Sequence, residues 1–162
     1  MFKNDILLKG KHATYAKMLC LTSEKKDLSS DRKPANVFSR IIDIYMVAPV
    51  IGLVYGLKRA EDKESKDSVR IFADAVIGEQ KNLECIFQMA MLVDDSSLSA
   101  DEKINRAFRS EEEKKRFELF NSYVRGGIEW LYEQFTTGTT THDEYIAKIN
   151  EIVSSFKEEH DL

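Results

Sequence analysis

The sequence predicts an all-α protein, a single domain spanning residues 1–162 with about six helices around a central apolar helix. Only two of its 162 residues are proline, and 43% are hydrophobic and 32% charged, a composition typical of helical globular proteins. Apolar residues recur at helical spacing in most segments. No segment combines period-two alternation with the turn residues of a β-hairpin, so no strand is expected.

The first elements are short and polar. Residues 1–10 are expected to form a flexible tail or lead-in, and residues 11–21 a short helix with apolar positions at helical spacing. Residues 22–35 are polar throughout and end near Pro34. This composition predicts a surface connection between the first helix and the apolar segment that follows.

The segment 36–58 is the most apolar part of the chain and predicts the central helix. Its uninterrupted apolar run, residues 44–57, is shorter than the roughly 20 residues that span a bilayer. We therefore expect a helix buried by neighbouring helices and no membrane association. Pro49 lies inside it and predicts a kink or a break.

Small residues form a stripe on this central helix. Ala48, Gly52 and Gly56 are spaced by four residues, so they share one face that another helix can approach closely. The second half of the chain supplies the expected neighbours: an amphipathic helix over residues 69–93 and three helices that begin at Ser/Thr-x-x-Glu capping boxes. The boxes are Ser99 with Glu102, Ser110 with Glu113, and Thr141 with Glu144.

Two acidic residues interrupt apolar patterns and, with the small-residue stripe, mark a candidate protein-interaction site. Asp43 lies in the central helix and Glu79 in the amphipathic helix. Buried acids are paired or mark functional sites. A structural explanation is favoured here, in which Asp43 pairs with Arg40 and Glu79 turns outward at a local irregularity after Gly78. The Arg125–Gly127 sequence is interpreted similarly, as a close helix contact or a bend.

Charge is distributed unevenly. Residues 1–60 carry a net charge of +6 and residues 61–162 a net charge of −10, so a basic surface that attracts phosphates is an alternative functional site. The usual interpretation of interspersed charges is a solvated face. The residues of this nucleic-acid hypothesis are Lys9, Lys11, Lys17, Lys25, Lys26, Arg32, Lys33, Arg40, Lys58 and Arg59.

Catalytic chemistry has little support in the sequence. The three histidines, His12, His142 and His160, lie in polar stretches and are expected at the surface, so catalysis through any of them has little support. Glu61 and Glu64 match one half of the paired ExxE and ExxD elements with which all-α nucleotide pyrophosphohydrolases hold magnesium, but no second element follows at a suitable place. We predict no catalytic residue, metal or cofactor, and a helical nucleotide hydrolase is the third hypothesis.

The two cysteines are well separated in the sequence. Cys20 and Cys85 have no second ligand at metal-binding spacing, so neither a zinc site nor a disulfide framework is expected. A cytoplasmic location is the default expectation.

The central helix resembles a segment of small helical accessory proteins found beside bacterial anti-phage systems, including those associated with DNA phosphorothioation (Dnd) genes. This resemblance implies an accessory, complex-forming role in defence against foreign DNA, and it carries over no catalytic residue. The leading hypothesis is a non-enzymatic adaptor that binds a protein partner or itself. The resemblance rests on Phe38, Asp43, Tyr45, Met46, Ala48, Gly52, Gly56 and Lys58.

Overall fold

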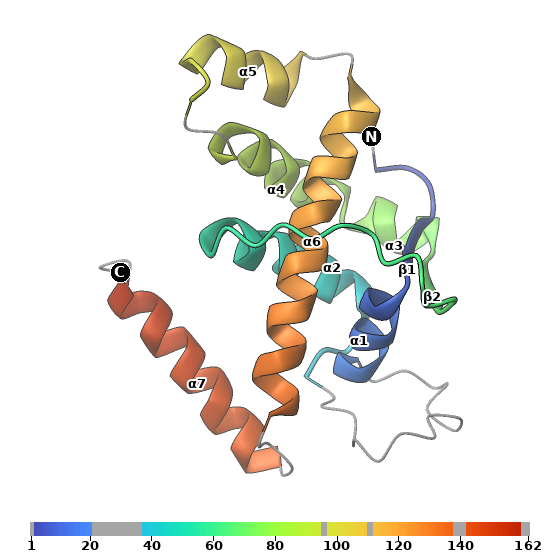
Figure 1. The fold of residues 1–162 in the computed structure, drawn as a ribbon, viewed down its shortest axis with the longest axis vertical. Coiled ribbons are helices and arrows are strands. Elements are labelled where there is room, and N and C mark those ends of the chain that lie inside the picture. Colours follow the sequence, from blue (N-terminus) through green and yellow to red (C-terminus); the bar gives the residue numbers. More distant parts are fainter. Residues whose placement is uncertain (1, 21–36, 95–96, 110–111, 138–141, 160–162) are drawn as a thin grey trace.

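The computed structural model describes residues 2–20, 37–94, 97–109, 112–137 and 142–159. Helices dominate these residues, which confirms the predicted fold class (Figure 1). Seven helices and two strands lie in the described ranges. In chain order they are β1 (Ile6–Lys9), α1 (Lys11–Leu19), α2 (Ile41–Val54), β2 (Ser68–Ile71), α3 (Ala73–Gly78), α4 (Gln80–Val93), α5 (Ala100–Phe108), α6 (Glu113–Thr136) and α7 (His142–Glu159).

The two strands contradict the expectation of a chain without β-structure. β1 and β2 pair antiparallel, with Ile6 opposite Ile71 and Lys9 opposite Ser68. The predicted helix over residues 69–93 is therefore wrong at its start, and it is further divided into α3 and α4 at Gly78–Glu79. Strands of four residues are too short to show a clear period, and their pairing is long-range, so no local hairpin turn signals it.

The N-terminal stretch is packed, so the expectation of a flexible tail is wrong. Phe2 is only 1% exposed, and its ring lies 5.4 Å from that of Phe117 and 6.0 Å from that of Phe87. Because aromatic pairs of this kind add to the free energy of burial, Phe2 ties the start of the chain to the core.

The crossing of α2 and α6 forms the centre of the fold (Figure 1). Glycines on both helices bring the two backbones together, as the small-residue stripe and the Arg-Gly-Gly sequence predicted. α2 continues through Pro49, so the break considered there does not occur. A Cβ atom added at Gly52, Gly126 or Gly127 would overlap the backbone of Tyr123, Leu57 or Ala48, respectively.

The central helix ends where its small-residue stripe ends. Gly56 has a φ of +64°, a left-handed conformation that glycine adopts without the steric cost of a Cβ. The N–H of Leu57 donates to the carbonyl of Gly52 (2.7 Å) and that of Gly56 donates to the carbonyl of Leu53 (3.3 Å). This is a Schellman motif, so the helix is shorter than the predicted 36–58 segment and the third stripe residue terminates it.

One of the three predicted capping boxes is observed at the start of a later helix. Ser99 and Glu102 form the reciprocal capping box that starts α5. The other two predicted boxes include Ser110 and Thr141, which lie outside the described residues. α7 runs back beside α6 and diverges from it (Figure 1), and in its described part no side chain is fully buried.

Candidate functional site

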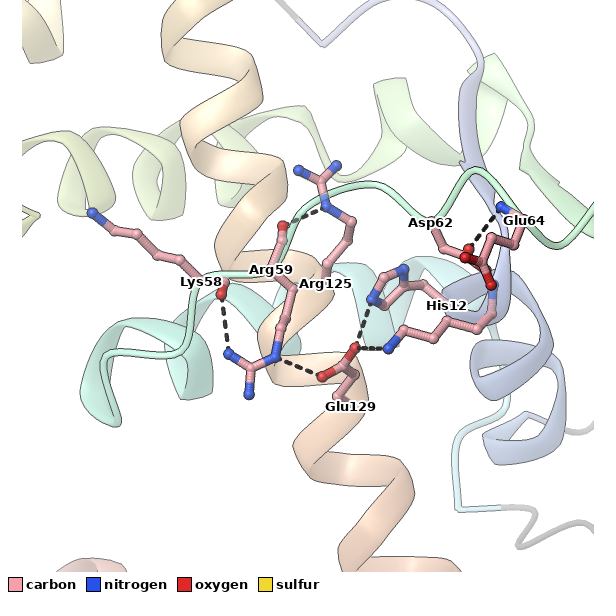
Figure 2. Close-up of polar contacts among 8 residues, drawn as sticks. His12, Lys58, Arg59, Asp62, Glu64, Arg125 and Glu129 are labelled. Carbon is pink, nitrogen blue, oxygen red and sulfur yellow. Dashed lines mark hydrogen bonds and ion pairs between the residues drawn. The ribbon is translucent and has the colours of Figure 1, made fainter.

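A cluster of charged side chains joins α1, the loop between α2 and β2, and α6. The carboxylate of Glu129, on α6, accepts hydrogen bonds from Lys11 Nζ (2.7 Å), His12 Nε2 (3.1 Å) and Arg59 Nε (2.7 Å) (Figure 2). Burial of Glu129 raises its pKa, but the hydrogen bonds from Lys11 and Arg59 outweigh this, so the pKa lies below its usual value. The carboxylate is therefore charged near neutral pH.

His12 is buried, so the expectation of a surface histidine is wrong. Gly10, with a φ of +68°, turns the chain sharply from β1 into α1 and so brings His12 inward. Burial lowers the pKa of His12, although the adjacent Glu129 raises it. The ring is neutral near pH 7, and the hydrogen-bond pattern assigns its proton to Nε2, which donates to Glu129. Nδ1 is then an acceptor, and it has no hydrogen-bond partner among the described residues.

The buried ring of His12 lies at a cleft of about 490 Å³ between β1 and α6. The N-terminal residues 4–9 form one wall. Glu113, Lys114, Phe117, Glu118, Asn121 and Arg125 form the opposite wall on α6, and Glu61 contributes from the loop before β2. We call this space the β1 cleft. It combines apolar side chains with charges of both signs.

Arg125 fixes the loop after α2 against α6. Its Nε donates to the carbonyl of Arg59 (2.8 Å; Figure 2), and its guanidinium pairs with Glu118. The N–H of Arg59 in turn donates to the carbonyl of Ser122 (3.0 Å). Because Arg125 is only 7% exposed, these contacts hold a buried cation in place. The Arg-Gly-Gly sequence thus serves helix packing, as expected.

The basic residues of the nucleic-acid hypothesis are largely neutralised within the fold. Each described member of that set has an acidic partner: Lys9 pairs with Glu61, Lys11 with Glu129, Lys17 with Asp67, Arg40 with Asp43 and Glu79, Lys58 with Asp94, and Arg59 with Glu129. Lys25, Lys26, Arg32 and Lys33 lie outside the described residues. Paired cations contribute little net positive potential, so the described part of this set forms no basic surface.

The predicted magnesium element is not on a helix. Glu61 and Glu64 lie in the loop between α2 and β2, so their spacing does not place them on a shared helix face, and Glu61 pairs with Lys9 at 3.8 Å. Within the described ranges, no group of three or more His, Cys, Asp or Glu residues could hold a metal ion. The structure therefore offers no support for the hydrolase hypothesis.

The candidate interaction residues fall into two groups. Ala48 and Gly52 face α6 and are buried, and Gly56 ends α2. Asp43 and Glu79 meet at Arg40, whose guanidinium lies 2.5 Å from Asp43 and 3.1 Å from Glu79.

The acid pair behaves as the structural explanation expects. Asp43 pairs with Arg40, and Glu79 stands at the break between α3 and α4. Hydrogen bonds from Asn82 and Arg40 lower the pKa of Glu79. These contacts join α2 to the start of α4.

A second hollow is lined almost entirely by apolar side chains, unlike the β1 cleft. It has a volume of about 340 Å³ and lies between the C-terminal part of α2, α6 and α7. The rings of Tyr55 and Trp130 stack with centroids 5.3 Å apart at its base. We call this hollow the apolar groove. Its lining is Ile51, Tyr55, Trp130, Ile152, Val153, Phe156 and Lys157.

Neither hollow could be predicted from a local pattern in the sequence. Glu129 and His12 are separated by more than one hundred residues, and neither interrupts a visible pattern, so no local signal identifies their contact. Trp130 is different. It is the single tryptophan of the sequence, and because tryptophan is enriched at the centres of protein interfaces, it could have marked the apolar groove.

Comparison with families of known proteins gives a match. A family model described as "DNA sulphur modification system-associated protein 4" matches residues 22–161, which confirms the resemblance seen in the central helix. No curated protein and no solved structure matches the chain. In the described part of the chain, every helix is too short or too polar to cross a membrane.

Proposed function

We propose that this chain, which belongs to the family of DNA sulphur modification system-associated protein 4, is a non-enzymatic adaptor that binds another protein of that system. The family description supports the accessory role. The observation that carries the adaptor mechanism is the apolar groove beside α7, because exposed apolar surface of this kind marks sites where proteins bind one another.

α7 has an apolar face that the rest of the described chain covers only in part. Ile146, Ile149 and Val153 are 46%, 39% and 47% exposed. They recur at helical spacing, so they lie along one side of α7. A partner that covered this side would remove their apolar surface from water, at a gain of roughly 25 cal/mol per Å² before the costs of association.

The base of the apolar groove is suited to hold an apolar anchor from the partner. Tyr55 and Trp130 are stacked and therefore already ordered. Rigid aromatic side chains of this type carry much of the binding free energy in protein interfaces. Lys157 at the rim adds a positive charge. We infer that the partner contributes an apolar side chain between α7 and Trp130.

Co-purification with the other proteins of the system tests this proposal. Val153→Glu places a charge in the groove at a position that is already half exposed, so the fold should tolerate it. We expect at least tenfold weaker binding of the partner. Ser154→Glu is the matched control, because Ser154 is an exposed neighbour that does not line the groove, and it should leave binding unchanged.

Two outcomes would contradict the proposal. Equal retention of the partner by both variants would show that the groove is not the interface. The second outcome is self-association, which light scattering of the purified chain detects. If the chain is a dimer and Val153→Glu dissociates it, the groove binds a second copy of this chain and not another protein of the system.

A further inference from the structure

The strand β1 is paired on one side only. In the described residues the sheet has two strands, and β2 is the only neighbour of β1. The N–H of Gly10 donates to the carbonyl of Asp67 (2.8 Å), in register with the ladder. Because hydrogen-bonded pairs alternate along antiparallel strands, the N–H and C=O groups of Leu7 and Lys9 point away from β2. Among the residues that the structure describes, nothing pairs with these groups, so they form a free strand edge.

The β1 cleft lies along this free edge. Residues 4–9 all line it, although successive side chains of a strand point to opposite faces, and no residue of β2 lines it. A hollow over one face of the sheet would instead include β2 and only every second residue of β1. Across the cleft, Lys114, Phe117, Asn121 and Arg125 present one face of α6.

An unpartnered acceptor lies at the end of this edge. His12 follows β1 by three residues, its side chain is 1% exposed, and it lines the cleft. Its Nε2 is bound to Glu129, and its Nδ1 lacks a donor within the part of the chain that the structure describes. A buried acceptor without a donor is costly. Nδ1 is fully covered in the free chain, so a ligand that brings an N–H or O–H group to it has to displace the side chains above the ring.

We propose that the β1 cleft binds an extended peptide segment of another protein, which pairs with β1 as a third strand and donates a hydrogen bond to His12 Nδ1. In an extended peptide, the N–H and C=O groups of every second residue point to the same side, so they can pair with those of Leu7 and Lys9. The addition of a strand to a sheet edge in this way is a common mode of peptide recognition. Leu7, 48% exposed, and the half-buried Phe117 supply apolar contacts for the peptide's side chains.

This site is separate from the apolar groove. The two hollows share no lining residue, so the peptide site goes beyond the proposed adaptor contact and neither depends on the other. Val153→Glu should leave peptide binding unchanged. If Val153→Glu instead abolished binding of the peptide, the β1 cleft would not be its site.

A displayed library of random hexapeptides, selected against the full chain, supplies the probe. The affinity of the best peptide is then measured by calorimetry for a series of peptides with one N-methylated amide each. We expect N-methylation at alternate positions to weaken binding at least tenfold, because only alternate amides reach the edge of β1. Failure to select any peptide, or equal tolerance of N-methylation at all positions, would overturn the proposal.

A matched pair of variants tests whether the edge of β1 provides the hydrogen bonds to the peptide. Leu7→Pro removes the N–H that points to the free edge, and proline is tolerated at such edge positions. Leu7→Ala keeps that N–H. We expect Leu7→Pro to weaken the peptide at least tenfold and Leu7→Ala to weaken it only a few-fold. Equal affinity of the peptide for Leu7→Pro and the unmodified chain would contradict strand addition.

The nitrogen resonance of His12 Nδ1 gives a readout that needs no variant. Addition of the peptide to the ¹⁵N-histidine-labelled chain should shift this resonance towards the hydrogen-bonded range, while that of Nε2 stays nearly constant. An Nδ1 resonance that is the same with and without saturating peptide would exclude His12 from the site and overturn the proposal, even if Leu7→Pro failed to fold.

Discussion

The long helix α6 makes two contacts that differ sharply. Against α2, its glycines allow no space for a single added Cβ atom. Against α7, it leaves the apolar groove of about 340 Å³. Both neighbours are apolar on the side that faces α6. Apolar character alone therefore does not place a helix in the core, because close contact between two backbones needs small residues on both helices.

The contacts of α6 with α2 and with α7 have different roles. The α2–α6 crossing and the Glu129 cluster beside it hold the fold together. The α6–α7 contact leaves apolar side chains exposed for a partner. Mutations should therefore affect the free energy of unfolding strongly at the crossing, less at the cluster, and least at the groove.

Gly127→Ala should have the largest effect on stability. The new methyl group would overlap the backbone of Ala48, and two packed helices have to separate to accommodate it. We expect a loss of about 3 kcal/mol in the free energy of unfolding, measured by urea denaturation. Gly78→Ala is the control, because nothing lies within 4 Å of an added Cβ there. It should leave stability unchanged or raise it by up to about 1 kcal/mol.

Glu129→Gln should have the next largest effect. The amide keeps the shape of the side chain but removes the charge that Lys11 and Arg59 share. We expect a loss of about 2 kcal/mol in the free energy of unfolding. Glu133→Gln, an exposed change one helical turn away, should cost less than about 0.5 kcal/mol. Equal effects of the two changes would show that the cluster does not stabilise the fold.

Acidification should weaken the cluster through His12. Because burial lowers its pKa in the folded protein, the unfolded chain binds the proton more readily, and stability falls as the pH drops below about 6.5. The slope cannot exceed about 1.4 kcal/mol per pH unit for one proton. Glu129 favours the protonated ring, and Lys11 and Arg125 oppose it.

Urea denaturation at pH 7.5 and pH 5.5 measures this dependence, and His12→Gln provides the comparison. The carboxylates with lowered pKa values, including Glu129 and Asp67, lose their contribution only at lower pH. The variant should therefore be less dependent on pH in this range. An unchanged dependence in His12→Gln would contradict the assignment of the effect to this ring.

Val153→Glu should have the smallest effect on stability. Val153 is 47% exposed, so the charge remains in contact with water. We expect the free energy of unfolding to change by less than about 0.5 kcal/mol, although partner binding weakens at least tenfold. A loss above 2 kcal/mol would show that α7 is part of the core, and the contrast between the two contacts of α6 would then be wrong.

The sequence predicted the features that depend on local chemistry. The small residues of α2, the close contact at Gly126 and Gly127, and the Ser99–Glu102 cap each depend on spacing within one segment. The pairing of Asp43 with Arg40 is similarly local. These features follow from helical geometry alone and required no knowledge of which helices meet.

Features that depend on distant segments were missed. β1 and β2 pair across some sixty residues of sequence, and neither is long enough to show a period. His12 is buried because Gly10 turns the chain and because Glu129 comes from α6. Its polar surroundings in the sequence indicate a surface position, since the residues that bury it are remote.

Hydrogen exchange of the backbone amides, compared between the free chain and its complex with the co-purified system protein, tests the adaptor proposal most directly. In the free chain, the amides of α7 should exchange faster than those of α2, because α7 is less buried. In the complex, we predict slower exchange in α7 and around Tyr55. Unchanged exchange in α7, with new protection confined to other elements, would contradict the account.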